Sequence, residues 1–165
     1  MRRYVPYVGI ALGLIIAVYA LFFAQSPEDA IRDQLDRLEG AVAVEPGSQP
    51  VIRAARVKGA FEELFVKEVT FDVPELDGSD QGRDELVALA AAAPRLFQEA
   101  RVDLDGLAVD MAEDEKSAIA VGEAIIMGAR HGAAVRRDTR TVSIRFDDVE
   151  GDWLIVSLSV SPPGS

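Results

Sequence analysis

The sequence TVSIRFDDVEGDWLIVSLSVS, residues 141–161, decides the fold that we expect for this chain. Val142, Ile144 and Phe146 alternate with polar residues, a short polar segment with a glycine follows, and the extended pattern then resumes. Period-two alternation on both sides of a polar turn predicts a β-hairpin. A half-buried hairpin of this length needs a larger sheet to join and a layer of helices to cover it. In the second strand, the expected apolar face consists of Leu154, Val156, Leu158 and Val160.

The residues before this hairpin predict three helices and one short strand. A hydroxyl, a proline and two acids open the first helix at Ser26, because a capping oxygen and negative charges stabilise a helix start. The next helices are expected from Pro50 and from Arg83, with apolar residues at helical spacing. On the second helix, Arg53 falls between the apolar positions and is expected on the solvated face. Between these two helices, a strand that ends at Pro74 is predicted by Val69, Phe71 and Val73.

From residue 100 to the end of the chain, the pattern predicts long antiparallel strands. A change of alternation at Gly106 predicts a bulge. The segment 117–129 differs from the others, because it is apolar on both faces. Two-sided burial implies a central strand of the sheet, or an outer face covered by a partner subunit. The residues of one face are Ile119, Val121, Ile125 and Met127, and those of the other are Ala118, Ala120, Ala124 and Ile126.

An uncharged segment near the amino terminus is long enough to cross a bilayer. Residues 4–24 carry no charge, and 21 residues at about 1.5 Å each span the hydrocarbon core. Arg2 and Arg3 precede this segment and acids follow it, so the positive-inside rule keeps the amino terminus in the cytoplasm. We therefore expect a single-pass anchor in a bacterial-type inner membrane, with a periplasmic, extracytoplasmic domain. The alternative is a signal peptide, and the sequence leaves open whether residues 1–20 are cleaved.

Composition bounds the classes of partner for this domain. The chain has 165 residues, which suits an anchor over residues 1–25 and one domain over residues 26–165. Outside the anchor, 15 basic residues face 28 acidic ones, a net charge of about −13. This charge opposes binding to nucleic acid and to anionic lipid. The chain contains no cysteine, which excludes disulfides and lipoprotein modification.

The expected order of elements is a membrane helix, two helices, a short strand, a helix and then long strands. In this order, and in GRDEL at residues 82–86 and FDDVEGDWLIV at residues 146–156, the chain resembles the nuclear transport factor 2-like superfamily over residues 27–161. The resemblance implies an α+β fold in which a curved antiparallel sheet wraps around about three helices as a cone. The superfamily contains isomerases, dehydratases, ligand-binding modules and assembly domains, so this fold does not by itself choose an activity.

Asp72 is the first weak candidate for catalysis. Ketosteroid isomerases of this superfamily carry a general-base carboxylate on the first strand, directly before a proline. The matching position here is Val73, before Pro74, and a valine cannot accept a proton. Alternation places Asp72 opposite Phe71 and hence toward solvent, so the isomerase role carries over only if Asp72 turns inward.

Glu123 is the second weak candidate, because alternation groups it with Val121 and Ile125. A carboxylate among apolar neighbours would have a raised pKa, and it could move a proton or bind a polar ligand group. The simpler interpretation makes the alanine side of this strand the core face, with Glu123 exposed or paired with an arginine of the next strand. The candidate pocket for a small apolar ligand would be lined by Phe61, Phe65, Phe71, Glu123 and Met127.

No metal site and no cofactor are expected. His131 is the only histidine, lies in an expected loop and has no cysteine with which to share a metal. The oxygen donors at residues 77–80 lack the spacing of an EF-hand loop. Serine–histidine and cysteine–histidine catalysis lack support, and no glycine motif for phosphate occurs. An anion site, or pairing with acids of neighbouring strands, is open to Arg136, Arg137, Arg140 and Arg145.

These observations favour a non-catalytic, membrane-anchored binding or assembly module that acts as a homodimer or as a subunit of an envelope protein complex. Its layout is similar to the anchored assembly subunits of bacterial type IV secretion systems, in which a membrane helix precedes a domain of this superfamily. The alternatives are a carrier for a small apolar ligand, and an isomerase or dehydratase that uses Glu123. The domain has no tyrosine to donate a proton, because the tyrosines all lie in the anchor: Tyr4, Tyr7 and Tyr19.

Overall fold

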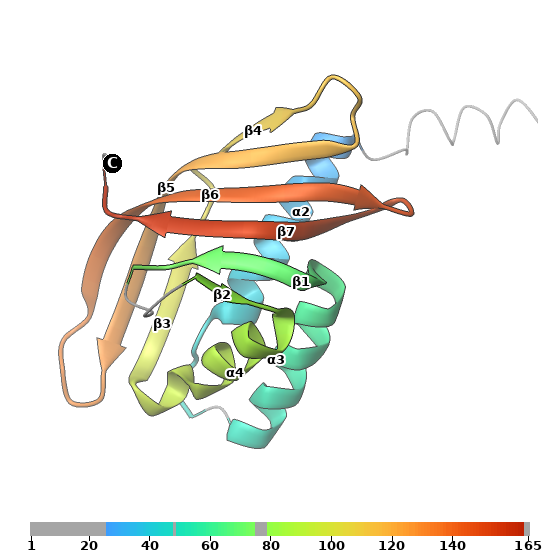
Figure 1. Ribbon diagram of the computed structural model, residues 1–165. Coiled ribbons are helices and arrows are strands. Elements are labelled where there is room, and N and C mark those ends of the chain that lie inside the picture. The colour runs from blue at the N-terminus through green and yellow to red at the C-terminus, as the bar shows by residue number, and fades with distance from the viewer. Residues whose placement is uncertain (1–25, 48, 75–78, 164–165) are drawn as a thin grey trace, which may run out of the picture.

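The computed structural model describes residues 26–47, 49–74 and 79–163, and in this part of the chain a curled sheet encloses three helices (Figure 1). The helices are α2 (Pro27–Val42), α3 (Pro50–Leu64) and α4 (Arg83–Ala92), with a short 3-10 helix η1 (Ala93–Arg95) after α4. The strands are β1 (Phe65–Asp72), β2 (Ser79–Gln81), β3 (Phe97–Asp103), β4 (Ala108–Met111), β5 (Ser117–Arg130), β6 (Arg136–Val149) and β7 (Asp152–Ser161). The expected α+β fold is confirmed.

The seven strands form one sheet in the order β2-β1-β7-β6-β5-β3, and β4 also pairs with β5. The other neighbours are antiparallel, but β1 and β7 run parallel, so the sheet is mixed. The expectation of an antiparallel sheet is wrong for this pair. Alternating side chains mark a strand without specifying the direction of its neighbour.

The predicted hairpin consists of β6 and β7, which are joined by Glu150 and Gly151. Both residues have positive φ angles, 58° and 98°, as in a type I′ turn, whose twist suits a two-residue hairpin. Asp148 stabilises the turn, because its Oδ1 accepts a hydrogen bond from the Gly151 N–H at 2.8 Å.

The inner face of β7 changes where the register between β6 and β7 shifts. Near the turn, the buried residues are Trp153 and Ile155. The prediction that Leu154 and Val156 share the core face is therefore wrong, because one extra residue in a strand reverses the alternation beyond it.

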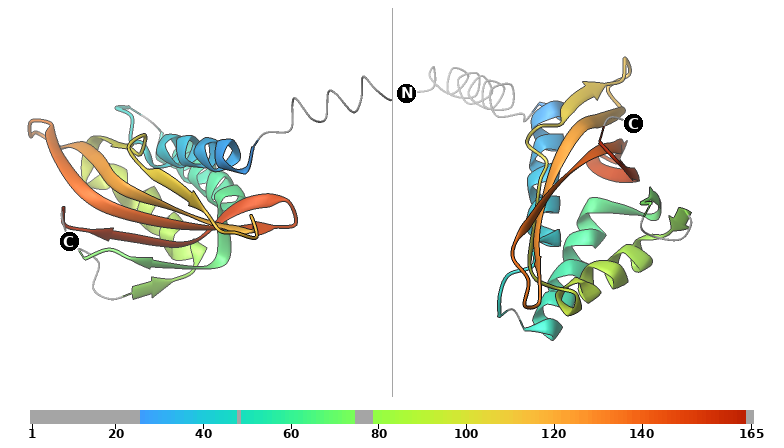
Figure 2. Two further views of the ribbon diagram at one scale, coloured as in Figure 1. Left: turned by 90° about the horizontal axis from the view of Figure 1, so that it is seen from above. Right: turned by 90° about the vertical axis from the view of Figure 1, so that its left-hand side faces the viewer.

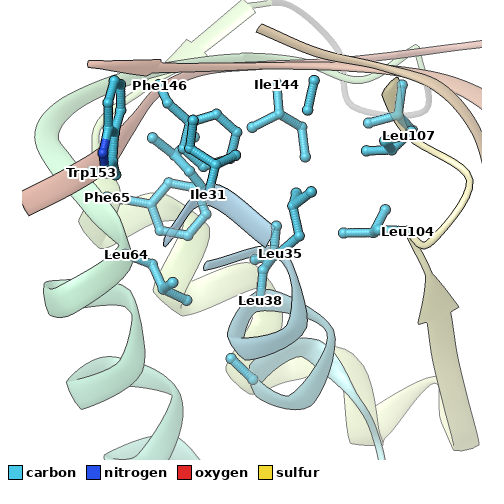
Figure 3. Close-up of a cluster of buried hydrophobic side chains, with 14 of the residues drawn as sticks. Ile31, Leu35, Leu38, Leu64, Phe65, Leu104, Leu107, Ile144, Phe146 and Trp153 are labelled. Atoms are coloured by element: carbon cyan, nitrogen blue, oxygen red, sulfur yellow. The ribbon is translucent and has the colours of Figure 1, made fainter. Parts of the chain in front are cut away.

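The core lies between the helices and the concave side of the sheet (Figure 2, Figure 3). Helix α2 begins as predicted at Ser26, whose Oγ accepts a hydrogen bond from the Asp29 N–H at 3.1 Å. It packs against β3, β4 and β7, while α3 packs against β1 and β7, and α4 against β1. The side chains that fill this core include Ile31, Leu35, Leu38, Leu64, Phe65, Leu104, Leu107, Ile144, Phe146 and Trp153.

Arg53 of α3 departs from the predicted helix faces, because its side chain is only 2% exposed. Its guanidinium donates to the backbone oxygens of Val42 (3.2 Å) and Ala43 at the end of α2, and to that of Ala90 (3.3 Å) in α4. Carbonyl groups at helix ends carry partial negative charge, so they offset the charge of the guanidinium. Burial lowers the pKa of Arg53, yet an arginine stays protonated in proteins. The solvated position predicted for Arg53 is wrong, since its side chain joins two helix ends.

The predicted interruption at Gly106 separates β3 from β4, which both pair with β5. Between the last pair of β3 and the first pair of β4, five residue steps face four on β5, as at a bulge. The backbone of this segment passes close to Gly122 of β5. A Cβ at Gly122 would lie 2.8 Å from the backbone oxygen of Gly106, so this position requires a glycine.

The predicted membrane anchor, residues 4–24, lies outside the described residues. Among the residues that are described, no helix is both long and apolar enough to cross a lipid bilayer. Helix α2 begins at the end of the molecule opposite the β5–β6 turn (Figure 1).

Candidate functional site

A hollow of about 650 Å³ opens inside the curl of the sheet, near the turn between β5 and β6. Its walls come from the ends of several strands and from that turn. A volume of this size lies in the range of ligand pockets, about 300–1,000 Å³. The apolar part of the lining includes Val73, Phe97, Ile126 and Val160.

The polar groups of the hollow come mainly from the inner side of β6. Arg136, Asp138 and Arg140 follow the same alternation as Val142 and Ile144, whose side chains are buried in the core. The Arg140 Nε donates to the Asp138 Oδ2 at 2.8 Å. Of the two roles that the sequence left open for Arg140, the structure thus shows pairing, with an acid of its own strand.

Among the described residues, the hollow supports binding better than proton transfer. A general base that works near neutral pH is typically a carboxylate whose pKa is raised by burial. Asp138, the one carboxylate in the lining, is 57% exposed and forms an ion pair with Arg140. Val73, the residue directly before Pro74, also lines the hollow, so an apolar side chain occupies the position expected for the base of an isomerase.

The structure does not bring together the five residues of the predicted ligand pocket. Phe61, Phe65 and Phe71 are at most 3% exposed, and the ring centroids of Phe61 and Phe65 lie 4.9 Å apart. Glu123 and Met127 belong to the opposite face of β5, where Glu123 is exposed. The core takes the alanine side of this strand, where the buried residues are Ala118, Ala120 and Ala124.

Asp72 and His131 also lie outside the hollow. Asp72 is exposed at the end of β1, while its neighbour Phe71 is buried, as alternation predicts. His131 is exposed in the turn between β5 and β6, where its Nε2 lies 3.0 Å from the backbone oxygen of Pro94.

The outer face of the sheet, which points away from the core, carries an apolar row on β5. Ile119 and Val121 are 39% and 37% exposed, and Ile125 and Met127 are half-buried. The helices pack on the other side, and the strands lie in front of α3 and α4 when viewed from above (Figure 2, left). The strand register places small polar residues of β6 and β7 beside the row: Thr139, Thr141, Ser143, Ser157, Ser159 and Ser161.

On β5 and β6, four charged side chains of the outer face have no hydrogen-bond or ion-pair partner within the described part of the chain. They are those of Glu123 on β5, and of Arg137, Arg145 and Asp147 on β6. Glu123 pairs in register with Thr141, which is four residues from each arginine, so the acid lies midway between the two bases. At about 3.3 Å per residue, each arginine is about 13 Å away along the strand.

A second hollow, of about 410 Å³, lies beside Ile119. Asp110 of β4 and Arg145 of β6 contribute to its lining, and both are in register with Ile119 from opposite sides. The outer face therefore has a depression next to its exposed apolar row and next to one of the two arginines.

Three carboxylates meet where α2 reaches the segment between β3 and β4. Oxygens of Glu39, Asp103 and Asp105 lie within 4.8 Å of one another. Burial raises the pKa of Glu39, the hydrogen bond from the Leu104 N–H opposes this shift, and the charges of the two aspartates add to it. A calcium site takes six to eight oxygens, so these three carboxylates alone do not define a metal site.

Solved structures share this architecture at low sequence identity. A nuclear transport factor 2 (NTF2-like) superfamily protein from Salmonella enterica has a TM-score of 0.67 at 15% identity, over 86% of this chain and 94% of that chain. An NTF2-like protein with a cystatin-like fold from Novosphingobium aromaticivorans has a TM-score of 0.65 at 15% identity, over 91% and 90%. A hexachlorocyclohexane dehydrochlorinase (LinA) Type2 has a TM-score of 0.64 at 13% identity, over 84% and 95%. No family model and no curated protein matches the sequence.

Proposed function

We propose that this chain, which has the nuclear transport factor 2-like fold, is a non-catalytic, membrane-anchored binding module of the cell envelope. It associates with a second copy through the outer face of its sheet. The observation that carries the proposal is the apolar row on β5, where Ile119 and Val121 are each more than a third exposed. An exposed apolar row rimmed by polar residues is typical of a protein–protein interface.

The dimensions of the outer face suit a specific interface. The row from Ile119 to Met127 and its flanks extend over about 30 Å at about 3.3 Å per residue. Four strands about 4.8 Å apart then give a flat face of about 600 Å², and side chains that protrude from it add further accessible area. A specific interface buries about 800 Å² on each partner, which is a similar area.

The anchor predicted for residues 4–24 supports association. Chains confined to one membrane meet at a higher effective concentration than chains free in solution, so even a modest interface is occupied. In the predicted orientation, residues 26–165 lie in the periplasm. The outer face would then be presented to other copies alongside the inner membrane.

The oligomeric state of the full-length protein in detergent tests this proposal. Sedimentation should show a dimer for the wild type and a monomer for Val121→Asp, because a charge at the centre of an apolar contact is left unpaired. The matched control is Val51→Asp on α3, where the valine is 82% exposed and lies outside the sheet, and this variant should stay dimeric. A monomeric wild type, or a wild type bound to a different envelope protein, contradicts self-association.

The hollow favours a second candidate function, the binding of a small organic anion. Its apolar walls match the body of such a ligand, and the guanidinium of Arg136 matches a carboxylate. In calorimetry, a medium-chain fatty acid should bind the wild type and lose affinity for Arg136→Glu. Arg137→Glu, which changes the outer face of the same strand, should keep the affinity. Equal binding to both variants, or no binding to the wild type, contradicts a ligand site in the hollow.

A further inference from the structure

We propose that the two copies meet through reciprocal ion pairs, in which Glu123 of each copy binds Arg145 of the partner subunit. The two-fold axis crosses β5 and β6 at the pair formed by Val121 and Ser143. This inference rests on the proposed self-association and adds the register in which the two outer faces meet.

Two-fold symmetry restricts which residues of a single face can form pairs. In an isologous interface, the same patch is used on both subunits, so a contact from residue i to residue j occurs twice. Two sheets packed face to face are related by an axis that lies between them. Each residue then meets a partner residue that lies at the same distance on the other side of the axis. An acid and a base of one face form two equivalent ion pairs when the axis bisects the line between them at right angles.

Glu123 and Arg145 meet this condition. They lie on neighbouring strands, and in the register of β5 and β6 the pair of Val121 and Ser143 is at the midpoint between them. Both charged side chains are exposed, and neither has a partner within the described residues. The axis at this midpoint also brings Val121 of one copy onto Val121 of the other, so the centre of the contact is apolar.

Arg137 is the competing base, because it is as far from Glu123 as Arg145 is. An axis that paired Glu123 with Arg137 would cross β5 at Ile125, which is already half-buried. The axis that pairs Glu123 with Arg145 instead buries Ile119 and Val121 in the interface, the two most exposed apolar residues of the row. Burial of apolar area stabilises association in proportion to the area removed from water, so pairing of Glu123 with Arg145 is favoured over pairing with Arg137.

The hollow beside Ile119 gives the incoming carboxylate a place next to Arg145. Glu123 of the partner subunit would enter this depression and accept charge-assisted hydrogen bonds from the guanidinium. Asp110 also lines the depression, two strands away from Arg145. An incoming acid at contact distance from Arg145 is repelled by Asp110 over about 10 Å and by Asp147, two residues from Arg145 on the same face, over about 7 Å. Both repulsions are weaker than the attraction at contact distance.

Charge reversal in the full-length protein tests the register. Glu123→Arg and Arg145→Glu should each raise the dissociation constant of the dimer by roughly 100-fold or more, because each variant brings like charges together at two places. The double variant restores opposite charges and should return to within about tenfold of the wild type. Arg137→Glu is the matched control on the same strand and face, and it should change the constant by less than about tenfold.

The outcomes separate this inference from the proposed function. A dimeric wild type whose double variant stays as weak as the single ones, or whose Arg137→Glu is as weak as Arg145→Glu, overturns the register and leaves self-association standing. A monomeric wild type overturns both. Because the chain contains no cysteine, Val121→Cys gives an independent check in membranes. A bismaleimide that spans the about 10 Å between stacked sheets should link Val121→Cys to its own copy, and should link Ile125→Cys poorly.

Discussion

The two faces of β5 reverse the usual relation between side-chain size and burial. On the inner face, Ala120 and Ala124 have no exposed area, although an alanine removes little apolar surface from water. On the outer face, the larger Ile119 and Val121 are more than a third exposed. At Gly122 the inner face must be small, because the backbone of the segment between β3 and β4 passes close to this residue. The size of the outer residues has no such cause within the described chain, and the second copy that we propose would supply one.

The largest expected effect on stability comes from placing one charge on the inner face, and the same charge on the outer face serves as the comparison. Ala120→Asp should lower the free energy of unfolding by more than about 4 kcal/mol or prevent folding, because the carboxylate would be buried without a partner. Ile119→Asp, the adjacent residue on the outer face, should lower it by less than about 1 kcal/mol after extrapolation to low protein concentration. Chemical denaturation at several protein concentrations measures both values. Equal losses for the two variants would remove the contrast between the faces.

A smaller effect is expected from adding one methyl group to the inner face. Gly122→Ala should cost about 2 kcal/mol, since its Cβ would press on the backbone oxygen of Gly106 and force the strand to shift. Gly40→Ala in α2 is the control, because nothing lies within 4 Å of its Cβ position. That change should stabilise the protein by about 0.5–1 kcal/mol through helix propensity. The melting temperatures of the two variants should therefore shift in opposite directions. A Gly122→Ala variant with unchanged stability would show that the segment between β3 and β4 can move away from the added methyl group.

The smallest effect concerns Glu39, which holds the segment between β3 and β4 by accepting a hydrogen bond from the Leu104 N–H. Burial raises the pKa of Glu39 above 4.5, so folding favours the protonated form. Its contribution to stability is present below pH 4.5 and is lost as the pH rises through the raised pKa of the folded state. Glu39→Gln still accepts the hydrogen bond and should gain stability relative to the wild type as the pH rises through this window. A difference between the two proteins that is constant with pH would contradict this account.

Local signals predicted the elements of the fold well. The capping hydroxyl of Ser26 marks the start of α2, and the Glu150 and Gly151 turn joins β6 to β7. Both features depend on a few neighbouring residues, which a sequence displays directly. The parallel pairing of β1 with β7 and the register shift in β7 depend on strands that are distant in the chain, so alternation alone could not predict them.

The candidate site was harder to predict, because it depends on which face of β5 meets the core. Both faces are apolar, and the sequence left Glu123 open between an inner and an outer position. The close passage of the backbone over Gly122, which selects the alanine face, has no local signature other than the glycine itself. Arg53 shows the same limit, since its burial depends on two helix ends that meet only in the folded chain.

The most direct test of the central claim is the rate at which maleimide modifies Ile119→Cys in native membranes. The full-length chain contains no other cysteine, so this rate reports on the outer face of β5 alone. If a second copy covers this face, modification should be slow, and it should become fast when Arg145→Glu is added. The same fast rate with and without Arg145→Glu would show that the outer face is open to solvent, and would contradict the account.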